Sequence, residues 1–317
     1  MQKIRSACLQ TEVFFEETVT SQHITMQGDY AMSKEQKMQE LREFAAEIRV
    51  ETLKIIGSRG FGHVGGSMSL ADAFAVLYGD VMKYDPKNPK WEDRDWCVLS
   101  KGHGGPVMYA TLGLKGFYPV ENAYQLNQPH TTFPSHTDHL MTPGVDLTTG
   151  SLGQGISEAV GAALGNKCQG RDSHTFVFVG DGEADEGQVW EAAQFAAHYK
   201  MNNLICLVDN NGRQLDGAVD VVMSHGKGIG AKFDAFGWHV IDVADGNDVE
   251  QIYDAIQEAY KVEDKPIALI LNTVKGKGAT FAESTGAHSS QPSKEEWDEA
   301  IKVAEENLAA VRAQKGA

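Results

Sequence analysis

Cysteine is scarce in this 317-residue chain. The four cysteines, Cys8, Cys97, Cys168 and Cys206, form no Cys-x-x-Cys pair, which favours unpaired thiols in a reducing compartment. No apolar run approaches the length of a membrane-spanning helix. The opening stretch, MQKIRSACLQTEVFFEETVT, lacks the apolar region of a signal peptide and contains acids. We therefore expect a cytoplasmic protein with no membrane contact.

Positive charge is also in short supply. The chain has 28 Lys and Arg against 44 Asp and Glu, a formal net charge of −16, which argues against a nucleic-acid-binding surface. A site for a phosphate group must then be local and assisted by a metal ion. Hydrophobic residues make up 42% and charged residues 23% of the chain, proportions typical of a soluble enzyme with a substantial core.

The first part of the chain shows no sustained periodicity. Met32 would make a natural start, so we expect residues 1–32 to be a mobile leader or a start-site artefact. Between residues 33 and 317 there is no internal repeat and no linker that would mark a second catalytic domain. The sequence thus predicts one domain over 33–317.

Two strands and the turns that follow them dominate the chain. An apolar β-branched run predicts a strand over 175–179; it ends in Gly180-Asp181-Gly182, and a plausible helix follows over 183–199. A second buried strand over 204–208 ends in Asp209-Asn-Asn211-Gly212. Ligands bind at the carboxyl ends of the strands in an open parallel sheet. We therefore expect Asp181 and Asn211 to be neighbours at that edge.

These residue types suit a hard divalent cation. A carboxylate, a carboxamide oxygen and a backbone carbonyl from the turn after Asn211 would make half an octahedral shell for Mg²⁺ or Ca²⁺, which takes its other ligands from phosphates. The glycines allow close backbone approach, and the helix start near Glu183 offers N–H groups to an anion. Each turn alone could be purely structural, but the pair within one βαβ unit favours a site.

Histidines stand in glycine-framed loops. His63 lies in GFGHVGG, and His103 lies in SKGHGG after a strand predicted over 96–99. Each could instead be a surface or capping-loop residue. His130, His136 and His139 cluster in HTTFPSHTDHLMTPG, but no further ligands of zinc spacing follow, so we do not expect zinc. Lys275 and Lys277, between glycines, could hold an anion or form a solvated turn, and both alternatives stay open.

The remaining pattern alternates strands and helices. Amphipathic or apolar periodicity predicts helices over 35–56, 70–82, 248–261 and 293–314, and strands over 238–243 and 267–271.

The GDGE and DNNG elements resemble the thiamine diphosphate fingerprint. Further stretches sharpen this to a resemblance to the N-terminal third of transketolase: GFGHVGGSMSLADAF, CVLSKGHGG, PSHTDHLMTPGVDLTTGSLGQGISEAVGAALG and FDAFGWHVIDVADGNDVEQI. They occur in the family's order over residues 37–297. The resemblance implies an α/β fold with a parallel β-sheet flanked by helices, the diphosphate-binding domain of a thiamine diphosphate enzyme.

The resemblance also implies a site. Asp181, Asn211 and the carbonyl of Arg213 would bind Mg²⁺ or Ca²⁺. The cofactor would contact His103, Gly150, Leu152, Asp181, Gly182, Asn211 and His288. The catalytic set would be His63, His103, His136 and His288, with Glu186 and Glu191 at a subunit interface, where an exposed helix face is the alternative. Val64 and Ser151 stand where the family often has proline, and GAHSSQ around His288 is a loose match. His130 and His139 would be structural.

The motifs leave half of a transketolase unaccounted for. The pyrimidine-binding domain, with the glutamate that activates the cofactor and the residues that grip a sugar phosphate, has no counterpart after His288. The resemblance therefore implies the N-terminal subunit of a split transketolase. It would transfer a two-carbon ketol unit from a ketose to an aldose with a C-terminal partner, in a two-plus-two assembly. A deoxyxylulose-phosphate-synthase-like subunit and a non-catalytic cofactor-binding remnant are the alternatives. The donor and acceptor sugars cannot be read.

Overall fold

Five parallel strands form the centre of the protein. The computed structural model describes residues 32–283 and 287–314, so the expectation of a leader over 1–32 falls almost wholly outside the described residues. The strand order is β1-β2-β3-β5-β4, with every neighbouring pair parallel, which confirms the predicted α/β fold. The strands are β1 (Trp96–Leu99), β2 (Thr175–Gly180), β3 (Leu204–Asn210), β4 (His239–Val243) and β5 (Ile267–Asn272).

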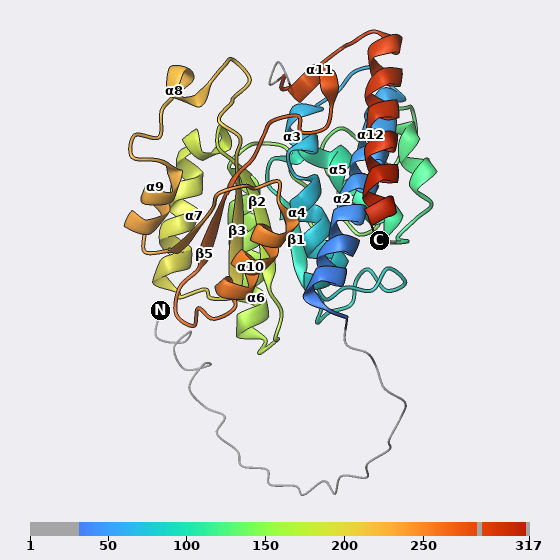
Figure 1. Ribbon diagram of the computed structural model, residues 1–317. Coiled ribbons are helices and arrows are strands. Elements are labelled where there is room, and N and C mark those ends of the chain that lie inside the picture. The colour runs from blue at the N-terminus through green and yellow to red at the C-terminus, as the bar shows by residue number, and fades with distance from the viewer. Residues whose placement is uncertain (1–31, 284–286, 315–317) are drawn as a thin grey trace, which may run out of the picture.

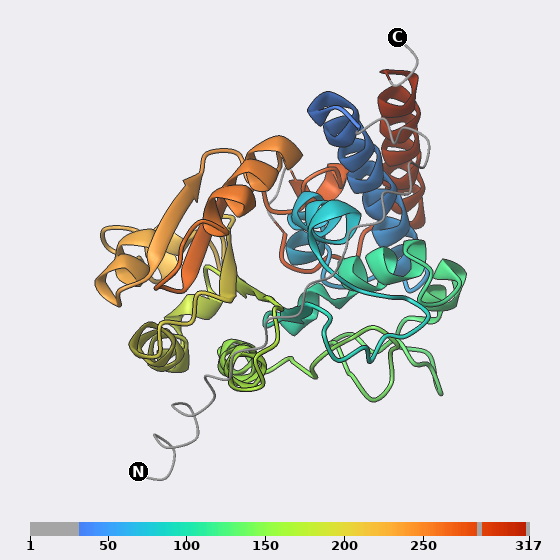
Figure 2. The same cartoon turned by 90° about the horizontal axis from the view of Figure 1, so that it is seen from below.

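Helices cover both faces of this sheet. Because every residue of β2 and nearly all of β3 and β5 are buried, these strands are continuous apolar runs of the kind that both-face burial requires. Figure 2 shows the sheet between α10 on one side and α6 and α7, seen end-on, on the other. One face carries α2 (Lys34–Gly57), α4 (Ala71–Val76), α5 (Gly105–Leu114) and α10 (Val249–Ala259); the other carries α6 (Gln154–Cys168), α7 (Gly187–His198) and α9 (Ile229–Ala235).

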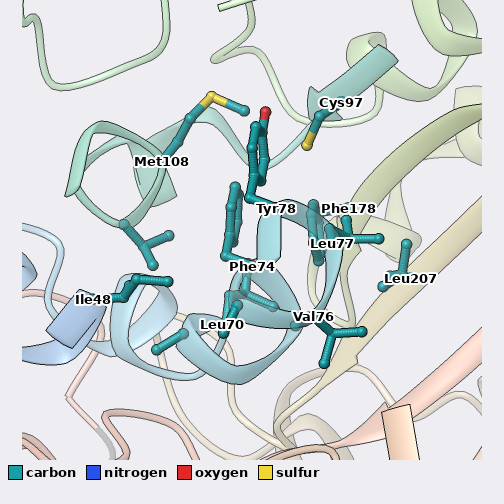
Figure 3. Close-up of a cluster of buried hydrophobic side chains, with 14 of the residues drawn as sticks. Ile48, Leu70, Phe74, Val76, Leu77, Tyr78, Cys97, Met108, Phe178 and Leu207 are labelled. Atoms are coloured by element: carbon teal, nitrogen blue, oxygen red, sulfur yellow. The ribbon is translucent and has the colours of Figure 1, made fainter. Parts of the chain in front are cut away.

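The larger core lies under α4. The Phe74 ring stacks on that of Phe178 from β2, with 4.7 Å between centroids, and on the ring of Tyr78 at 6.1 Å. Figure 3 shows these rings between Met108 and Leu207. Such a buried aromatic stack contributes several kcal/mol, on the order of the 3–5 kcal/mol lost when a buried Phe becomes Ala. The stack therefore fixes the position of α4 against the sheet.

A third layer lies outside α2. The helix α12 (Lys294–Gln314) packs along α2 (Figure 1), and Trp297 of α12 is buried in a cluster that includes Leu53 of α2 and Ala282, a residue that follows β5. The short helices α3 (Gly65–Met68), α8 (Val219–Val222) and α11 (Thr280–Glu283) lie at the upper end of the sheet in Figure 1. No helix in the described ranges is long and apolar enough to cross a membrane.

Two predicted helices are interrupted in the structure. The helix expected over 70–82 changes from α to π geometry at Leu77–Val81. The helix expected over 183–199 is a single 3₁₀ turn, Glu183–Asp185, followed by the extended residue Glu186 and then α7. The cause of the second break is the Glu183 carboxylate, which turns back to accept the backbone N–H groups of Gly180 and Gly153 at 3.0 and 2.8 Å. Contacts made in the tertiary structure, including one with a residue 30 positions away, therefore outweigh helical periodicity there.

Candidate active site

A cleft of about 220 Å³ opens at the carboxyl edge of the sheet. The loops after β1, β2, β3 and β5 all reach it, as expected for an open parallel sheet. In the register, Gly180 pairs with Asp209, so the turns after β2 and β3 meet at the same height. Residues lining the cleft include Gly66, Lys101, His103, Leu152, Asp181, Gly182, Asn211, Arg213, Gln214, Leu215, Lys275 and His288.

Asp181 joins the two turns. Its carboxylate accepts the N–H of Gly182 at 2.7 Å and the N–H of Gly212 at 2.6 Å, so the structure brings Asp181 and the Asn211 turn together as the sequence predicted. Burial, followed by the nearby charge of Asp209, raises the pKa of Asp181 to about 6. A buried carboxylate beside another negative charge lacks compensating positive charge, so a bound cation would stabilise its ionised form.

The donor atoms around Asp181 fit a hard divalent ion. Asn211 donates from Nδ2 to Asp209 at 3.0 Å, which leaves its Oδ1 on the side of the turn, where it accepts the N–H of Arg213 at 3.1 Å. The Arg213 carbonyl accepts a hydrogen bond from the ammonium of Lys275 at 2.8 Å, so this oxygen already faces a cation. Carboxylate, amide and carbonyl oxygens are the ligands of Mg²⁺ and Ca²⁺. Among the described residues, no cluster of three or more His, Cys, Asp or Glu could hold a metal.

A buried ion pair forms the floor of the site, and the sequence reasoning missed it. Lys101 donates to the carboxylate of Asp209, and their side chains are 2% and 0% exposed. Burial opposes ionisation of Asp209, but Lys101 and the hydroxyls of Ser69 and Thr273 hold its pKa below the ordinary value. Both residues stand inside quoted motifs, SKGHGG and DNNG, but nothing local in the sequence pairs them.

The two lysines after β5, Lys275 and Lys277, lie in different environments. Lys275 is 5% exposed and lines the cleft, and burial together with the charge of Lys101 lowers the pKa of Lys275 to about 8. Lys277 instead pairs with Glu283 at 3.3 Å and lines a different groove. Lys275 alone of the two is therefore placed to meet an anion in this cleft.

Four of the predicted histidines form one cluster. The ring of His63 lies 5.4–5.7 Å, centroid to centroid, from those of His103, His136 and His288, and the rings of His103 and His288 are 4.7 Å apart. Burial lowers the pKa of all four; for His288, burial and then Lys275 bring it to about 4. All four imidazoles are therefore neutral at pH 7, so each can both donate and accept a hydrogen bond.

The other histidines of the predicted group lie apart. His139 is exposed, and its Nδ1 contacts the hydroxyl of Thr148 at 2.8 Å. His130 is also exposed and adopts a left-handed backbone with φ 64°. In the part of the chain that the structure describes, neither ring lies against the four clustered rings.

The turn containing Gly150 packs on the cluster. Gly150 has φ 155°, and a Cβ atom there would lie 3.2 Å from the His136 ring, so a side chain would crowd the imidazole. Leu152 forms part of the cleft wall and is 36% exposed. Glu183 holds this turn through the N–H of Gly153. The sequence reasoning did not assign Glu183 that role.

Glu186 and Glu191 lie elsewhere. Both are exposed, Glu186 just before α7 and Glu191 on its outer face, and neither lines the cleft. The structure therefore does not bring them together with the histidines.

Comparison with known proteins identifies the fold's family. Residues 41–307 match the family model described as transketolase, thiamine diphosphate binding domain. This chain belongs to the transketolase family. The parallel sheet, the GDG turn and the clustered histidines are thus parts of that family's cofactor-binding domain.

Two relatives show how much of a transketolase the chain spans. It is 45% identical over 263 residues to the 6-deoxy-6-sulfo-D-fructose transketolase subunit SqwG of Clostridium sp. (strain MSTE9), covering 83% of this chain and 95% of that protein. It is 40% identical over 255 residues to the transketolase of Nostoc sp. (strain PCC 7120 / SAG 25.82 / UTEX 2576), covering 76% of this chain but 38% of that protein.

Solved structures of transketolases have the same fold over most of this chain. Transketolase from Pichia stipitis in complex with sedoheptulose-7-phosphate has a TM-score of 0.75 at 30% identity, covering 89% of this chain and 45% of that chain. Transketolase from Leishmania mexicana has a TM-score of 0.76 at 30% identity, covering 87% and 45%. The chain therefore spans less than half of each of these transketolases.

Proposed function

We propose that this protein is the N-terminal, diphosphate-binding subunit of a split transketolase that uses thiamine diphosphate and Mg²⁺. The observation that carries the proposal is a single cleft lined both by the oxygen donors Asp181, Asn211 and Arg213 and by His103 and His288, whose rings lie within 5.5 Å of the ring of His63. Residues 33–317 act as one cofactor-binding domain. With a partner chain, the enzyme moves a two-carbon ketol unit from a ketose to an aldose.

The chain's own residues divide the work. Asp181, Asn211 and the Arg213 carbonyl hold the divalent ion, while His103 and His288 contact the diphosphate. Gly182 lets the backbone come close, and the turn containing Gly150 and Leu152 contacts the cofactor rings. When bound, thiamine diphosphate supplies an electron sink for a carbanion. The ammonium group of Lys275, buried beside this donor set, supplies positive charge in a chain whose net charge is −16.

The imidazoles bind the sugar substrates and exchange protons with them. The ring of His63 lies next to the rings of His103 and His288, and the ring of His136 lies next to that of His63. Neutral imidazoles can accept a proton from a sugar hydroxyl and donate a hydrogen bond to a carbonyl oxygen, which is the work of general acid–base groups. The histidine cluster would bind the ketose and the acceptor in this way.

A partner chain completes the enzyme. The relative SqwG, which this chain covers almost entirely, is itself named a subunit, and the chain spans 38% of the Nostoc transketolase. The rim of the cleft exposes apolar side chains, with Leu215 69% exposed, so a second protein surface is needed to exclude water from the rings. We expect two copies of each chain in the assembly, with Glu186 and Glu191 in an interface.

The donor substrate is a ketose with a terminal anionic group, and ketoses that carry the anion on C6 are the first to test. The name of SqwG specifies a sulfonate, and a Pichia stipitis transketolase has been crystallised with fructose-6-phosphate. Both groups are compact anions, so the donor assay should compare 6-deoxy-6-sulfo-D-fructose with fructose-6-phosphate. A clear preference for either ketose defines the donor.

Calorimetry of thiamine diphosphate binding tests the cofactor assignment. The wild-type chain should bind in the presence of Mg²⁺ and lose most affinity after chelation, since the ion bridges the protein and a polyanion. Asp181→Ala should abolish the Mg²⁺-dependent part while the protein stays folded. The exposed Asp234 on α9 supplies a matched control, Asp234→Ala. Unchanged affinity in Asp181→Ala would overturn the metal site.

A further inference from the structure

The segment between Gly212 and Gly228 has little packing of its own. Among its residues, Val219 and His225 alone are buried, at 7% and 8% exposure, while Val221 is 84% exposed and Met223 58%. The segment nevertheless begins with the Arg213 carbonyl and Leu215, which belong to the cleft. Its position therefore depends on a small number of tethers.

His225 is the tether at the far end. Its Nε2 lies 2.9 Å from the Asp181 carbonyl, and its Nδ1 lies 3.0 Å from the ammonium of Lys232. An ammonium can only donate, so Nδ1 accepts and the ring proton sits on Nε2, which donates to Asp181. The carboxylate of Asp185, 3.8 Å from Nδ1, is the nearby acid. The ring orientation is thus determined from both sides.

The near end is tied to the same turn. Gln214 donates from Nε2 to Asp185 at 2.6 Å, and its own N–H donates to the Gly217 carbonyl at 2.8 Å. The Asp181 peptide is held on its other side as well, since its N–H donates to the Asp209 carbonyl at 3.1 Å. Both ends of the segment between Gly212 and Gly228 are therefore hydrogen-bonded to residues 181–185.

We propose that His225 is a positioning residue for the cation site. By donating to the Asp181 carbonyl it clamps the 213–228 segment to the end of β2, and so sets the distance between the Asp181 carboxylate and the Arg213 carbonyl. This inference rests on the proposed function, because the groups that it positions are the proposed metal ligands. His225 itself lies behind them and touches neither metal nor substrate.

Three substitutions separate the hydrogen bond from mere bulk. In shape, the amide nitrogen of Gln replaces Nε2 of histidine, whereas that of Asn replaces Nδ1. His225→Gln should therefore keep the bond to Asp181, and His225→Asn and His225→Ala should lose it. The exposed Val221 supplies a control truncation in the same segment, Val221→Ala.

The first readout needs no cofactor. Arg213 and Lys227, both exposed, are trypsin sites within the segment. Cleavage after Lys227 should be about tenfold faster in His225→Ala and His225→Asn, the change expected for loss of one buried hydrogen bond, and near the wild-type rate in His225→Gln and Val221→Ala. Equal cleavage rates in all five proteins would overturn the tether.

The second readout is the Mg²⁺ concentration at half-maximal thiamine diphosphate binding. It should rise about tenfold in His225→Ala and His225→Asn and return to within about twofold of wild type in His225→Gln. Equal Mg²⁺ requirements would overturn the positioning role, and so would impairment of His225→Gln to the level of His225→Asn. A wild-type chain that binds no cofactor either alone or with the partner chain would instead overturn the proposed function, with the proteolysis comparison still deciding the tether.

Discussion

At the scale of single residues, the imidazole cluster has a direct consequence for stability. Burial and the ammonium of Lys275 lower the pKa of His288 to about 4 in the fold, against an ordinary value of 6.5. The folded protein therefore prefers neutral His288. The stabilisation is fully present above pH 6.5 and is lost as the pH falls towards 4, because the unfolded chain binds the proton first.

Replacing His288 should therefore flatten the acid limb of the stability profile. We expect His288→Asn to lose about 1 kcal/mol less than wild type between pH 7 and pH 5, a value reduced for the ring's partial exposure. Urea unfolding across this range measures it. The adjacent Ser289→Ala, which removes no ionisable group, serves as control. Parallel pH profiles for wild type and His288→Asn would contradict the expectation.

Glu183 gives a second prediction at this scale. Its buried carboxylate accepts the Ser100 hydroxyl and two backbone N–H groups, those of Gly153 and Gly180. Glu183→Ala should cost about 3 kcal/mol, because buried donors are left without partners. Glu183→Gln, which keeps the shape and one acceptor, should cost about 1 kcal/mol. Unfolding midpoints in urea measure both losses, and equal losses would mean that the shape and the one acceptor kept by Gln contribute nothing to stability.

At the scale of elements, α7 has two different faces. Val189 and Ala193 are fully buried against the sheet. The outer face instead carries Glu191 and Phe195, and Tyr199 follows the end of the helix; the two rings are 40% and 49% exposed. An acidic residue beside large exposed apolar rings is more typical of a subunit contact than of a solvated helix face.

Charge reversal on α7 should weaken assembly without unfolding the chain. We expect the double variant Glu186→Lys, Glu191→Lys to keep its stability within about 0.5 kcal/mol, since both side chains are exposed. Its association with the partner chain should weaken at least about tenfold through like-charge or desolvation effects. Glu258→Lys on α10, across the sheet, is the control. Unchanged sedimentation behaviour of the double variant would place the interface elsewhere.

At the scale of the whole molecule, the proposed function makes the cleft one half of a site. The described residues include the proposed metal donors and the imidazoles but leave a rim of exposed apolar side chains, Leu152 and Leu215 among them. A reaction that passes through a carbanion needs exclusion of water from that rim. The second surface must come from another protein or another part of the enzyme.

The purified chain should therefore have no ketol-transfer activity alone. Activity should appear when a polypeptide carrying the remaining transketolase domains is added, and it should saturate at a one-to-one ratio of the chains. The measurement is aldose-dependent consumption of the C6-anionic ketose, with Asp181→Ala plus partner as the inactive control. Robust turnover by the chain alone would overturn the two-subunit proposal.

The sequence by itself determined the fold class and the proximity of Asp181 to the Asn211 turn. β1 begins and ends where predicted, and β2, β3 and β5 differ by one or two residues, because buried parallel strands are unbroken apolar runs with polar turns at their ends. Asp181 and Asn211 could be placed together because each directly follows such a strand. His63, His103, His136 and His288 were assigned through the family resemblance rather than from periodicity.

Tertiary structure alone decided the rest. The pairing of Lys101 with Asp209, the separation of Lys275 from Lys277 and the contact of His225 with Asp181 join residues far apart in the chain or in loops without periodicity. Local sequence does not encode such contacts, because they depend on which loops converge at one edge of the sheet. The same reason explains Glu183, where a carboxylate drawn to two backbone N–H groups ended a helix that the apolar pattern would have continued.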